Sequence, residues 1–422
     1  MFKFMKSETN RLAAIFALEG AIFAAVTNLA NNNNNLFAQR LGFTDTQMGL
    51  LSGLPQLVGL LVLLPGGILA DRLRNKRGML IAALCSAAAL YAGIAASPFL
   101  GEYAVAGFLG LLALSAAPIA IYNMGWSAFF SDVVTIERRN GILTVKNYVV
   151  FAVGILAPLI TGFLLSNAPD NGGKIALHQI FYAVAAICLV AQTFALRRVR
   201  GGDVTPTGGR NVRDYAAAAV RLARDKKFLG FVGVALFFYM TWHLDWTMYF
   251  IGEVRYIGLD EAWLAYVNVG NALVQAVTIP IWSKINNRKG ARFGMIFGAI
   301  GLAMNPVAIV TASFMPAAAA KPVFLALNTL AGFALCTTSL NILQNLLEAV
   351  PDADKTLSIS LYTCLITFSN MAMPMAGVQI YRALGADLQA LRSFFVIVFA
   401  LRAAATGLWF LRWKADRRAR HS

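Results

Sequence analysis

The amino-acid sequence predicts an all-α membrane protein with twelve transmembrane helices in two pseudo-symmetric bundles of six. Hydrophobic residues make up 58% of the 422 residues and charged residues only 13%, whereas charged residues are about a quarter of an average soluble chain. The charges are also clustered. They leave apolar runs of about 20 residues, the length that a helix needs to cross a bilayer core roughly 30 Å thick. A repeat between the two halves supports the division into bundles.

Apolar runs between clusters of charge give the twelve candidate helices in order. In the first half they cover 11–38, 46–71, 78–98, 103–124, 141–166 and 176–196. In the second half they cover 227–251, 261–283, 291–315, 322–346, 357–382 and 390–412. The predicted domains are an N-terminal bundle (1–196), a cytoplasmic basic linker (197–226), a C-terminal bundle (227–412) and a basic cytoplasmic tail (413–422). The end of the linker, 212–227, is predicted to form an amphipathic helix on the membrane surface.

The distribution of Lys and Arg predicts the orientation of these helices in the membrane. Most of the basic residues, including the linker, Arg138, Arg139 and Lys146, fall on the side of the two termini. Cytoplasmic loops of membrane proteins carry an excess of Lys and Arg, so both termini are predicted to be cytoplasmic. The predicted location is the cytoplasmic membrane of a bacterial cell. The net charge of +16 follows from this topology, and no nucleic-acid partner is predicted.

The two halves of the chain share a repeat at an offset of 216 residues. At this offset Gly42 aligns with Gly258, within similar segments at 41–51 and 257–267, and Pro158 aligns with Pro374. An offset close to half of the chain length indicates two homologous halves.

The segment GGILADRLRNKRG, residues 66–78, lies between the second and third candidate helices. It contains a Gly, three residues, an Asp, an Arg and a basic cluster, and it resembles the signature loop of the major facilitator superfamily. The matching residues are Gly67, Asp71, Arg72, Lys76 and Arg77, whereas Arg74 stands where that family has a second Gly. The corresponding segment of the second half, 280–290, has Lys284 in place of the Asp.

The resemblance implies a cytoplasmic latch formed by Gly67, Asp71, Arg72, Arg138 and Arg139. Asp71 would meet the positive N-terminal end of another helix and pair with Arg138 or Arg139 in the loop after the fourth helix. The alternative is a set of positive anchors without a switching role. For Arg74, Lys76 and Arg77 we expect only the anchoring role.

Four ionisable residues fall well inside the candidate helices, where charged groups are costly and often functional. Glu19 in the first helix is predicted to carry a proton, because a buried carboxylate can be neutralised during a transport cycle; the alternative is a structural carboxyl bonded to a neighbouring helix. Asp245 in the seventh helix is the second proton-coupling candidate, whereas His243 is expected to be a hydrogen-bonded packing residue. Arg402 in the twelfth helix requires a partner that the sequence does not name.

Five consecutive asparagines, Asn31 to Asn35, follow the apolar run of the first helix. The resemblance implies that this helix continues to about Arg40, and Asn is a poor helix former, so a local distortion is expected. Asn33 and Asn34 are the best placed of the five to face a solute. A frayed outer helix end is the alternative.

The resemblance also implies that the first, fourth, seventh and tenth helices bind the solute. Amides and indoles in these helices suit a neutral or zwitterionic polar solute with some apolar surface. The predicted substrate-binding residues are Asn33, Asn34, Asn123, Trp126, Trp242, Asn341 and Gln344. Asn328 and Asn345 share this character.

The predicted function is secondary active transport of such a solute by alternating access, with proton-coupled export as the first choice. Export is favoured because GILAPLITG, residues 154–162, partly resembles the Gly-Pro stretch in the fifth helix of drug/proton antiporters; Gly154, Pro158 and Gly162 match and Ala157 does not. A proton-coupled importer, a uniporter and a non-transporting receptor remain alternatives. No metal-ligand set, catalytic constellation or phosphate-binding loop is recognisable, so no enzyme and no cofactor are predicted. The expected partners are the solute, protons and the lipid bilayer, with each chain a complete transport unit.

Overall fold

The structure is a computed structural model of the whole chain, and it describes residues 8–199, 201–203, 220–222, 224–350 and 355–419. The described part of the chain is built from helices and contains no strand. It divides into two compact units, Met1–Gly209 and Arg210–Ser422. Most of the predicted amphipathic segment 212–227 lies outside the described residues.

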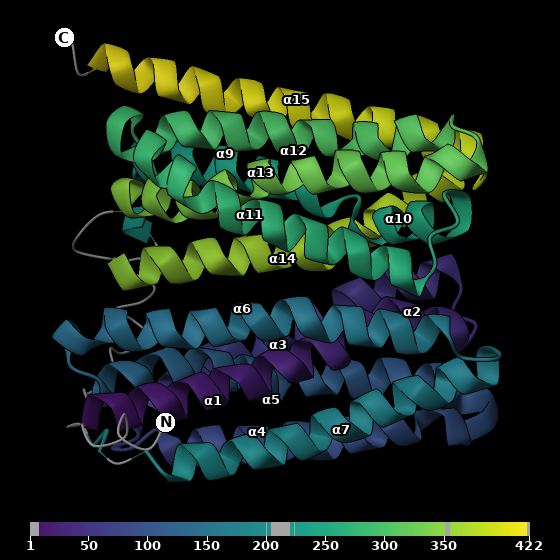
Figure 1. Cartoon of the computed structure of the whole chain (residues 1–422). Coiled ribbons are helices and arrows are strands. Elements are labelled where there is room, and N and C mark those ends of the chain that lie inside the picture. The colour runs from purple at the N-terminus through teal and green to yellow at the C-terminus, as the bar shows by residue number, and fades with distance from the viewer. Residues whose placement is uncertain (1–7, 200, 204–219, 223, 351–354, 420–422) are drawn as a thin grey trace. The chain divides into compact units, whose positions relative to one another are not determined.

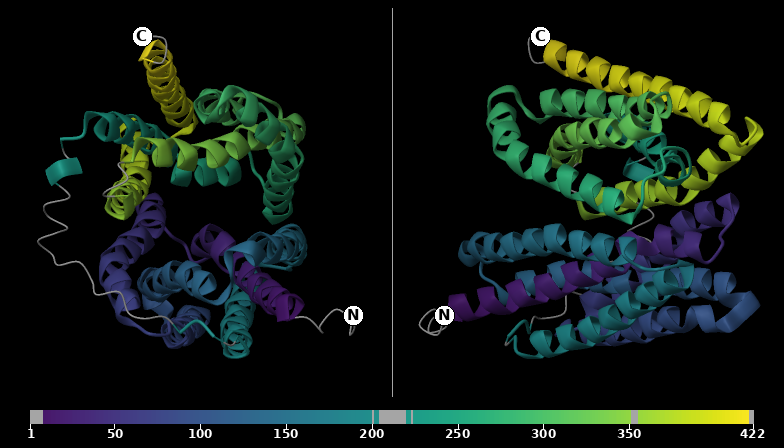
Figure 2. Two further views of the ribbon diagram at one scale, coloured as in Figure 1. Left: turned by 90° about the vertical axis from the view of Figure 1, so that its left-hand side faces the viewer. Right: turned by 45° about the vertical axis from the view of Figure 1, so that its right-hand side comes forward.

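The N-terminal unit consists of long helices that lie side by side (Figure 1; Figure 2). They are α1 (Glu8–Leu29), α2 (Asn34–Arg40), α3 (Asp45–Arg72), α4 (Arg77–Ala96), α5 (Ala104–Val133), α6 (Ile136–Ser166) and α7 (Asn171–Arg197). Helix α1 packs against α6 and α7, while α4 packs against α5 and α7. The side of α1 that carries Glu19 is therefore covered by other helices of its own unit, while Leu18 is 49% exposed.

The C-terminal unit has the same kind of helical architecture. Its helices are α9 (Lys226–His243), α10 (Trp246–Ile251), α11 (Glu261–Lys289), α12 (Ala291–Ser313), α13 (Ala317–Ala349), α14 (Lys355–Ala383) and α15 (Leu388–Ala419). Helices α12 and α13 approach closely, since a Cβ atom on Gly301 would lie 2.0 Å from the Cβ atom of Ala334. Helix α15 packs against α12 and α9, which places the last helix beside the first.

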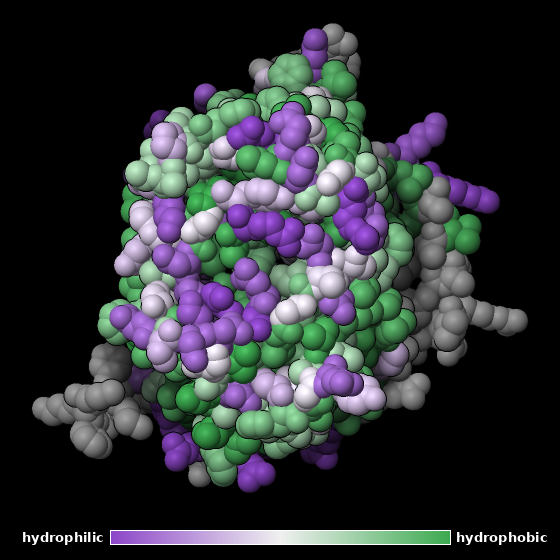
Figure 3. All heavy atoms as spheres, turned by 90° about the vertical axis from the view of Figure 1, so that its right-hand side faces the viewer, coloured by the Kyte–Doolittle hydropathy of each residue, from purple (hydrophilic) through white to green (hydrophobic). Residues whose placement is uncertain are grey.

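Eleven segments of the described chain are long and apolar enough to cross a membrane. One of them, 77–133, contains two helices, α4 and α5, which are joined by the 3₁₀ segment Ser97–Tyr103. Gly101 turns the chain there with a φ of 58°, a backbone conformation that favours glycine. The count is compatible with the twelve predicted helices. The face drawn in Figure 3 carries many polar side chains among apolar ones.

The first long helix of each unit is broken. Helix α1 ends at Leu29, and a 3₁₀ turn at Asn31–Asn33 separates it from α2. Helix α9 ends at His243, α10 starts at Trp246, and a π-helical turn follows at Gly252–Tyr256. At the repeat offset of 216 residues Asp245 aligns with Leu29, so the two breaks occupy equivalent positions in the two halves. Broken helices place polar backbone and side chains inside a membrane protein.

Candidate functional site

The carboxyl group of Glu19 is bonded to three neighbouring helices of the N-terminal unit. The Lys146 ammonium of α6 lies 2.9 Å from Glu19 Oε2. The Tyr122 hydroxyl of α5 donates to Glu19 Oε1, and Gln192 Nε2 of α7 donates to the same oxygen over 2.8 Å. Gln192 Nε2 also lies 2.7 Å from the Tyr122 hydroxyl. Glu19 is only 1% exposed, and such a buried charge needs partners of this kind to offset its desolvation.

Lys146 reaches Glu19 across a glycine. A Cβ atom on Gly20 would lie 2.7 Å from Cε and 2.8 Å from Cγ of Lys146, so the absence of a side chain there makes room for the lysine stem. The sequence places Lys146 on the side of the two termini but does not predict its partner; in the structure it lies beside Glu19 in a membrane-spanning helix. The residue lies near the start of its apolar run, where an anchoring lysine and a buried lysine look alike in the sequence.

Trp126 of α5 is a second described contact of the Lys146 ammonium. The Lys146 ammonium lies 3.4 Å from the centroid of the Trp126 ring, a cation–π contact. Phe130 stacks on the same indole with centroids 5.2 Å apart, and Phe16 meets it edge-on. The Trp126 Nε1 atom is buried and has no hydrogen-bond partner among the described residues. Asn123, three residues earlier on α5, is exposed.

The C-terminal unit has its own buried ion pair, between Asp245 and Arg402. Arg402 Nη2 lies 2.6 Å from Asp245 Oδ1, and the two residues are 3% and 1% exposed respectively. Asp245 is thus the partner of Arg402 that the sequence does not name. The pair joins the break in the first helix of the unit to α15, its last helix.

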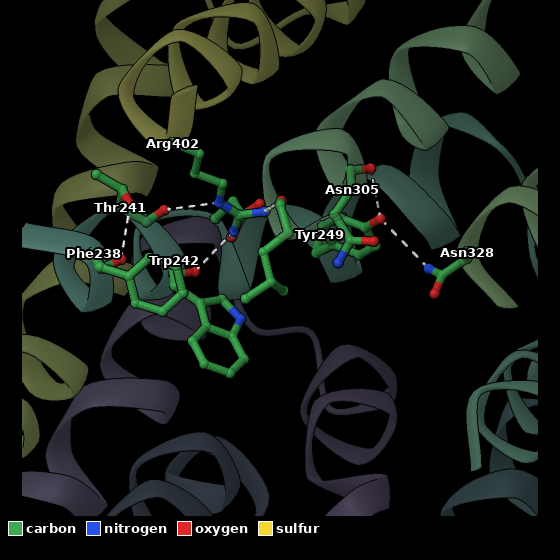
Figure 4. Close-up of polar contacts among 9 residues, drawn as sticks. Phe238, Thr241, Trp242, Tyr249, Asn305, Asn328 and Arg402 are labelled. Carbon is green, nitrogen blue, oxygen red and sulfur yellow. Dashed lines mark hydrogen bonds and ion pairs between the residues drawn. The ribbon is translucent and has the colours of Figure 1, made fainter. Parts of the chain in front are cut away.

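Arg402 also donates to three backbone carbonyl groups. They belong to Thr241 at 3.2 Å, Trp242 at 3.1 Å and Leu302 at 2.8 Å (Figure 4). The carbonyls of Thr241 and Trp242 lie in the last turn of α9, where helical hydrogen bonding stops. Arg402 therefore caps the broken helix end and neutralises Asp245 at the same time.

His243 and Trp242, which lie close to Asp245 in the sequence, contact residues outside the Asp245–Arg402 pair. His243 Nδ1 lies 3.1 Å from Ser369 Oγ of α14, and its ring packs against Trp246 with centroids 4.7 Å apart. Trp242 is half-buried and stacks on Tyr239, and its indole points away from Arg402 (Figure 4). His243 thus makes the packing and hydrogen-bonding contacts expected of it.

The asparagine run bonds within its own unit. Asn33 Nδ2 donates to the carbonyl oxygens of Asn28 at 3.0 Å and Leu29 at 2.9 Å, at the end of α1. Asn31 Oδ1 accepts from the Tyr91 hydroxyl over 2.6 Å, and Asn34 Oδ1 accepts from the Tyr182 hydroxyl. That Asn33 and Asn34 face a solute stays a prediction; Asn33 is 8% exposed and Asn34 is half-buried. Asn33 satisfies backbone groups freed by the break, and Asn34 joins α2 to α7.

The amides of α13 differ in their environment. Asn341 and Asn345 are buried, and each donates its Nδ2 to a backbone carbonyl four residues earlier. Gln344 is exposed. Asn328 is buried and bonds to Asn271 of α11 at 2.8 Å, and its Nδ2 lies 3.5 Å from the Tyr249 hydroxyl (Figure 4). The contacts of Asn328 join α13 to α11 and α10, whereas the bonds of Asn341 and Asn345 to backbone carbonyls lie within α13.

The end of the N-terminal unit at which α3 is followed by α4 has a salt bridge that the sequence does not predict. Lys76 Nζ lies 2.6 Å from Asp132 Oδ2, and Lys76 is buried. Lys76 is thus bonded within its own unit, and its expected anchoring role without a switching function stays a prediction. Arg139 donates to the carbonyls of Val134 at 3.0 Å and Ser131 at 2.8 Å, at the end of α5.

The remaining latch residues are only partly described. Arg138 is exposed. Gly67, Asp71 and Arg72 lie in the last part of α3, and their side chains lie outside the described part of the structure. The latch itself stays a prediction.

Two units of membrane-spanning helices, each starting with a broken helix and each holding a buried ion pair, define a polytopic membrane protein with a transporter architecture. The sequence matches the family described as Major Facilitator Superfamily over residues 14–267, more than half of the chain. The chain belongs to this superfamily. A comparison with curated proteins gave no match.

Solved structures of transporters share the fold over nearly their whole length. A D-xylose–proton symporter is 14% identical, with a TM-score of 0.72, covering 96% of this chain and 98% of that one. The nucleoside transporter NupG is 10% identical, with a TM-score of 0.72 and coverage of 96% and 99%. A bacterial homologue of the human lysosomal transporter Spinster is 14% identical, with a TM-score of 0.66 and 97% of both chains covered. At these identities the likeness concerns the fold.

Proposed function

We propose that this protein is a proton-coupled secondary transporter that moves a small polar or amphipathic solute across the membrane by alternating access. The observation that carries the proposal is the Glu19–Lys146 pair: an ionisable carboxyl 1% exposed, in the middle of a membrane-spanning helix, with one oxygen 2.9 Å from a lysine. Ionisable groups at this depth mark proton and substrate pathways by default.

The geometry of Glu19 suits reversible protonation. Its Oε1 is held by the neutral donors Tyr122 and Gln192, which keep their contacts whether or not the carboxyl carries a proton. Its Oε2 faces Lys146, so a proton on Oε2 replaces the lysine as the partner of that oxygen. Protonation would thus release Lys146 without displacing Glu19.

Asp245 is less suited to carry the transported proton. It is held by Arg402, which also caps the end of α9. Loss of the charge on Asp245 would leave a buried arginine without its counter-ion, a costly state. We therefore infer a structural role for Asp245 at the helix break, and we assign proton coupling to Glu19 alone.

Two directions of coupling each have an observation in their favour. The segment 154–162 lies in α6, the helix of Lys146, and its partial resemblance to drug/proton antiporters favours export. The release of Lys146 by a proton favours joint movement of proton and solute, and hence import down an inward proton gradient. Among the predicted solute contacts, Asn123 and Gln344 are exposed, and Asn34, Trp126 and Trp242 are half-buried, so these five are the most accessible candidates. We further infer that the protein resides in a bacterial cytoplasmic membrane with both termini in the cytoplasm.

The proposal is tested with purified protein in liposomes that contain a pH-sensitive dye. Sugars, amino acids, short peptides, nucleosides and drugs are applied to wild type, to Glu19→Gln and to Glu102→Gln, a matched change of an exposed carboxylate. We expect at least one solute to move protons in wild type and in Glu102→Gln but not in Glu19→Gln. The sign of the internal pH change separates import from export. Solute flux without proton movement in wild type would leave a uniporter, and no flux of any solute would favour a receptor.

A further inference from the structure

We propose that Lys146 is the receptor for a carboxylate group of the transported solute, so that the substrates are small carboxylates, including zwitterions. This inference rests on the proposed coupling at Glu19 and names the class of solute. The amides and indoles alone suit any neutral or zwitterionic polar solute; Lys146 adds the requirement for a carboxylate and also admits anionic solutes.

The donors around Lys146 outnumber the acceptors. The ammonium has three N–H donors, and its described partners are one carboxylate oxygen of Glu19 and the face of Trp126. The Trp126 Nε1 donor is buried without a described partner. Once Glu19 is protonated, this site holds a cation and an unused donor. Its chemical complement is an anion with hydrogen-bond acceptors, such as a carboxylate.

The two members of the ion pair differ in access. The Lys146 side chain is 15% exposed, whereas that of Glu19 is 1% exposed. A ligand can therefore approach the lysine while the carboxyl stays covered by Tyr122 and Gln192. The charged or titratable groups recorded in contact with Glu19 from the packed helices are Lys146 of α6 and Tyr122 of α5; Gln192 of α7 is neutral.

Charge balance links the proton to the solute. The ionised Glu19–Lys146 pair carries no net charge, and neither does protonated Glu19 with a carboxylate bound to Lys146. A proton without the carboxylate leaves a positive site, and a carboxylate without the proton leaves a negative one. Both states hold an uncompensated charge at low dielectric and are disfavoured. Proton and carboxylate therefore raise each other's affinity, as linkage requires, and they cross the membrane together.

The test is a binding measurement on the purified full chain in detergent. Aliphatic, aromatic and zwitterionic carboxylates, each paired with its own uncharged amide derivative, are titrated at acidic and neutral pH while the melting temperature is followed. We expect at least one carboxylate to stabilise wild type more strongly at acidic pH, and its amide derivative to have no such effect. In Glu19→Gln the carboxylate should bind at both pH values, because Lys146 is permanently released.

The decisive comparison uses variants that differ only at Lys146. Lys146→Gln alone leaves Glu19 buried without a cation and can fail to fold, so Glu19→Gln is compared with Glu19→Gln/Lys146→Gln. Removing a charge-assisted hydrogen bond should weaken the apparent affinity by about ten- to hundred-fold. The control is Glu19→Gln/Lys226→Gln, in which an exposed lysine is changed; it should bind like Glu19→Gln.

Three outcomes would overturn the proposal: no carboxylate stabilises the protein, the amide derivatives bind as well as the acids, or binding survives the loss of Lys146. These outcomes are separate from the fate of the proposed function. Proton movement driven by a neutral solute and abolished in Glu19→Gln would retain proton coupling and reject the carboxylate receptor. Carboxylate binding that needs Lys146, in a protein that moves no protons, would reject the coupling instead.

Discussion

Asp245 and Arg402 lie 2.6 Å apart in the interior of the C-terminal unit, although 157 residues separate them in the sequence. Arg402 also donates to carbonyls of Thr241 and Trp242 in the last turn of α9. One guanidinium thus stabilises both the acidic residue at a helix break and the open end of the helix before it. The break is held by the last helix of the unit, which carries Arg402.

Arg402→Met is predicted to destabilise the C-terminal unit strongly. The change removes the counter-ion of a buried carboxylate and should lower the free energy of unfolding by about 3–5 kcal/mol. Thermal unfolding in detergent measures the effect. Asp245→Asn/Arg402→Met should recover part of the loss because no buried charge remains. The exposed Arg224 provides the control Arg224→Met. Equal melting temperatures for Arg402→Met and Arg224→Met would contradict the role of Arg402 in stabilising the helix break.

Gly20→Ala is predicted to separate Lys146 from Glu19. The added methyl group would meet the lysine stem at 2.7 Å and 2.8 Å, closer than carbon atoms approach, so the lysine must move. Proton-coupled transport should fall sharply in the liposome assay. Gly110→Ala in α5 is the matched control, because a Cβ atom there has no heavy atom within 4 Å. Unchanged coupling in Gly20→Ala would show that the 2.9 Å contact is dispensable.

The two basic residues Lys76 and Arg74 of the signature loop are predicted to behave differently. Lys76→Met removes a buried partner of Asp132 and should cost roughly 1–3 kcal/mol of stability. Arg74 is exposed, and Arg74→Met should leave stability within about 0.5 kcal/mol of wild type. Chemical or thermal unfolding of both variants measures the two changes in stability. Similar, small effects would show that the Lys76–Asp132 bridge contributes little to stability.

Asn33→Ala tests whether the asparagine run is structural. The amide of Asn33 bonds two carbonyls at the end of α1, and its loss should lower stability by about 1–3 kcal/mol. Asn32→Ala changes an exposed neighbour and should have little effect. A loss of solute affinity in Asn33→Ala with an unchanged melting temperature would instead identify Asn33 as a substrate ligand.

The membrane-spanning helices could be predicted because their signal is local. Apolar length and the clustering of charge are properties of each segment alone, and the predicted ranges lie close to those observed, as for 46–71 against Asp45–Arg72. The break near the asparagines was indicated by their low helix propensity. The sequence did not indicate the role of Asn33, because that role depends on which carbonyl groups the broken turn leaves unpaired.

The sequence indicated several of the charged residues in the buried ion pairs, but not which residues pair with one another. Glu19, Asp245 and Arg402 are conspicuous as charges within apolar runs, but their partners come from helices far away in the sequence. The pairing of Lys146 was not predicted, because a lysine at the lipid surface and a buried lysine occupy the same place at the start of an apolar run. The space at Gly20 that lets Lys146 turn inward is a property of helix packing, which one sequence does not display.

The most direct test of proton coupling at Glu19 compares two modes of transport in the same liposomes. For any solute that wild type moves, exchange of labelled for unlabelled solute needs no net proton movement, whereas accumulation driven by a pH gradient does. We predict that Glu19→Gln retains exchange and loses gradient-driven accumulation, since its amide keeps the position held by Tyr122 and Gln192 but carries no exchangeable carboxyl proton. Accumulation in Glu19→Gln at the level of wild type would show that the transported proton is carried elsewhere.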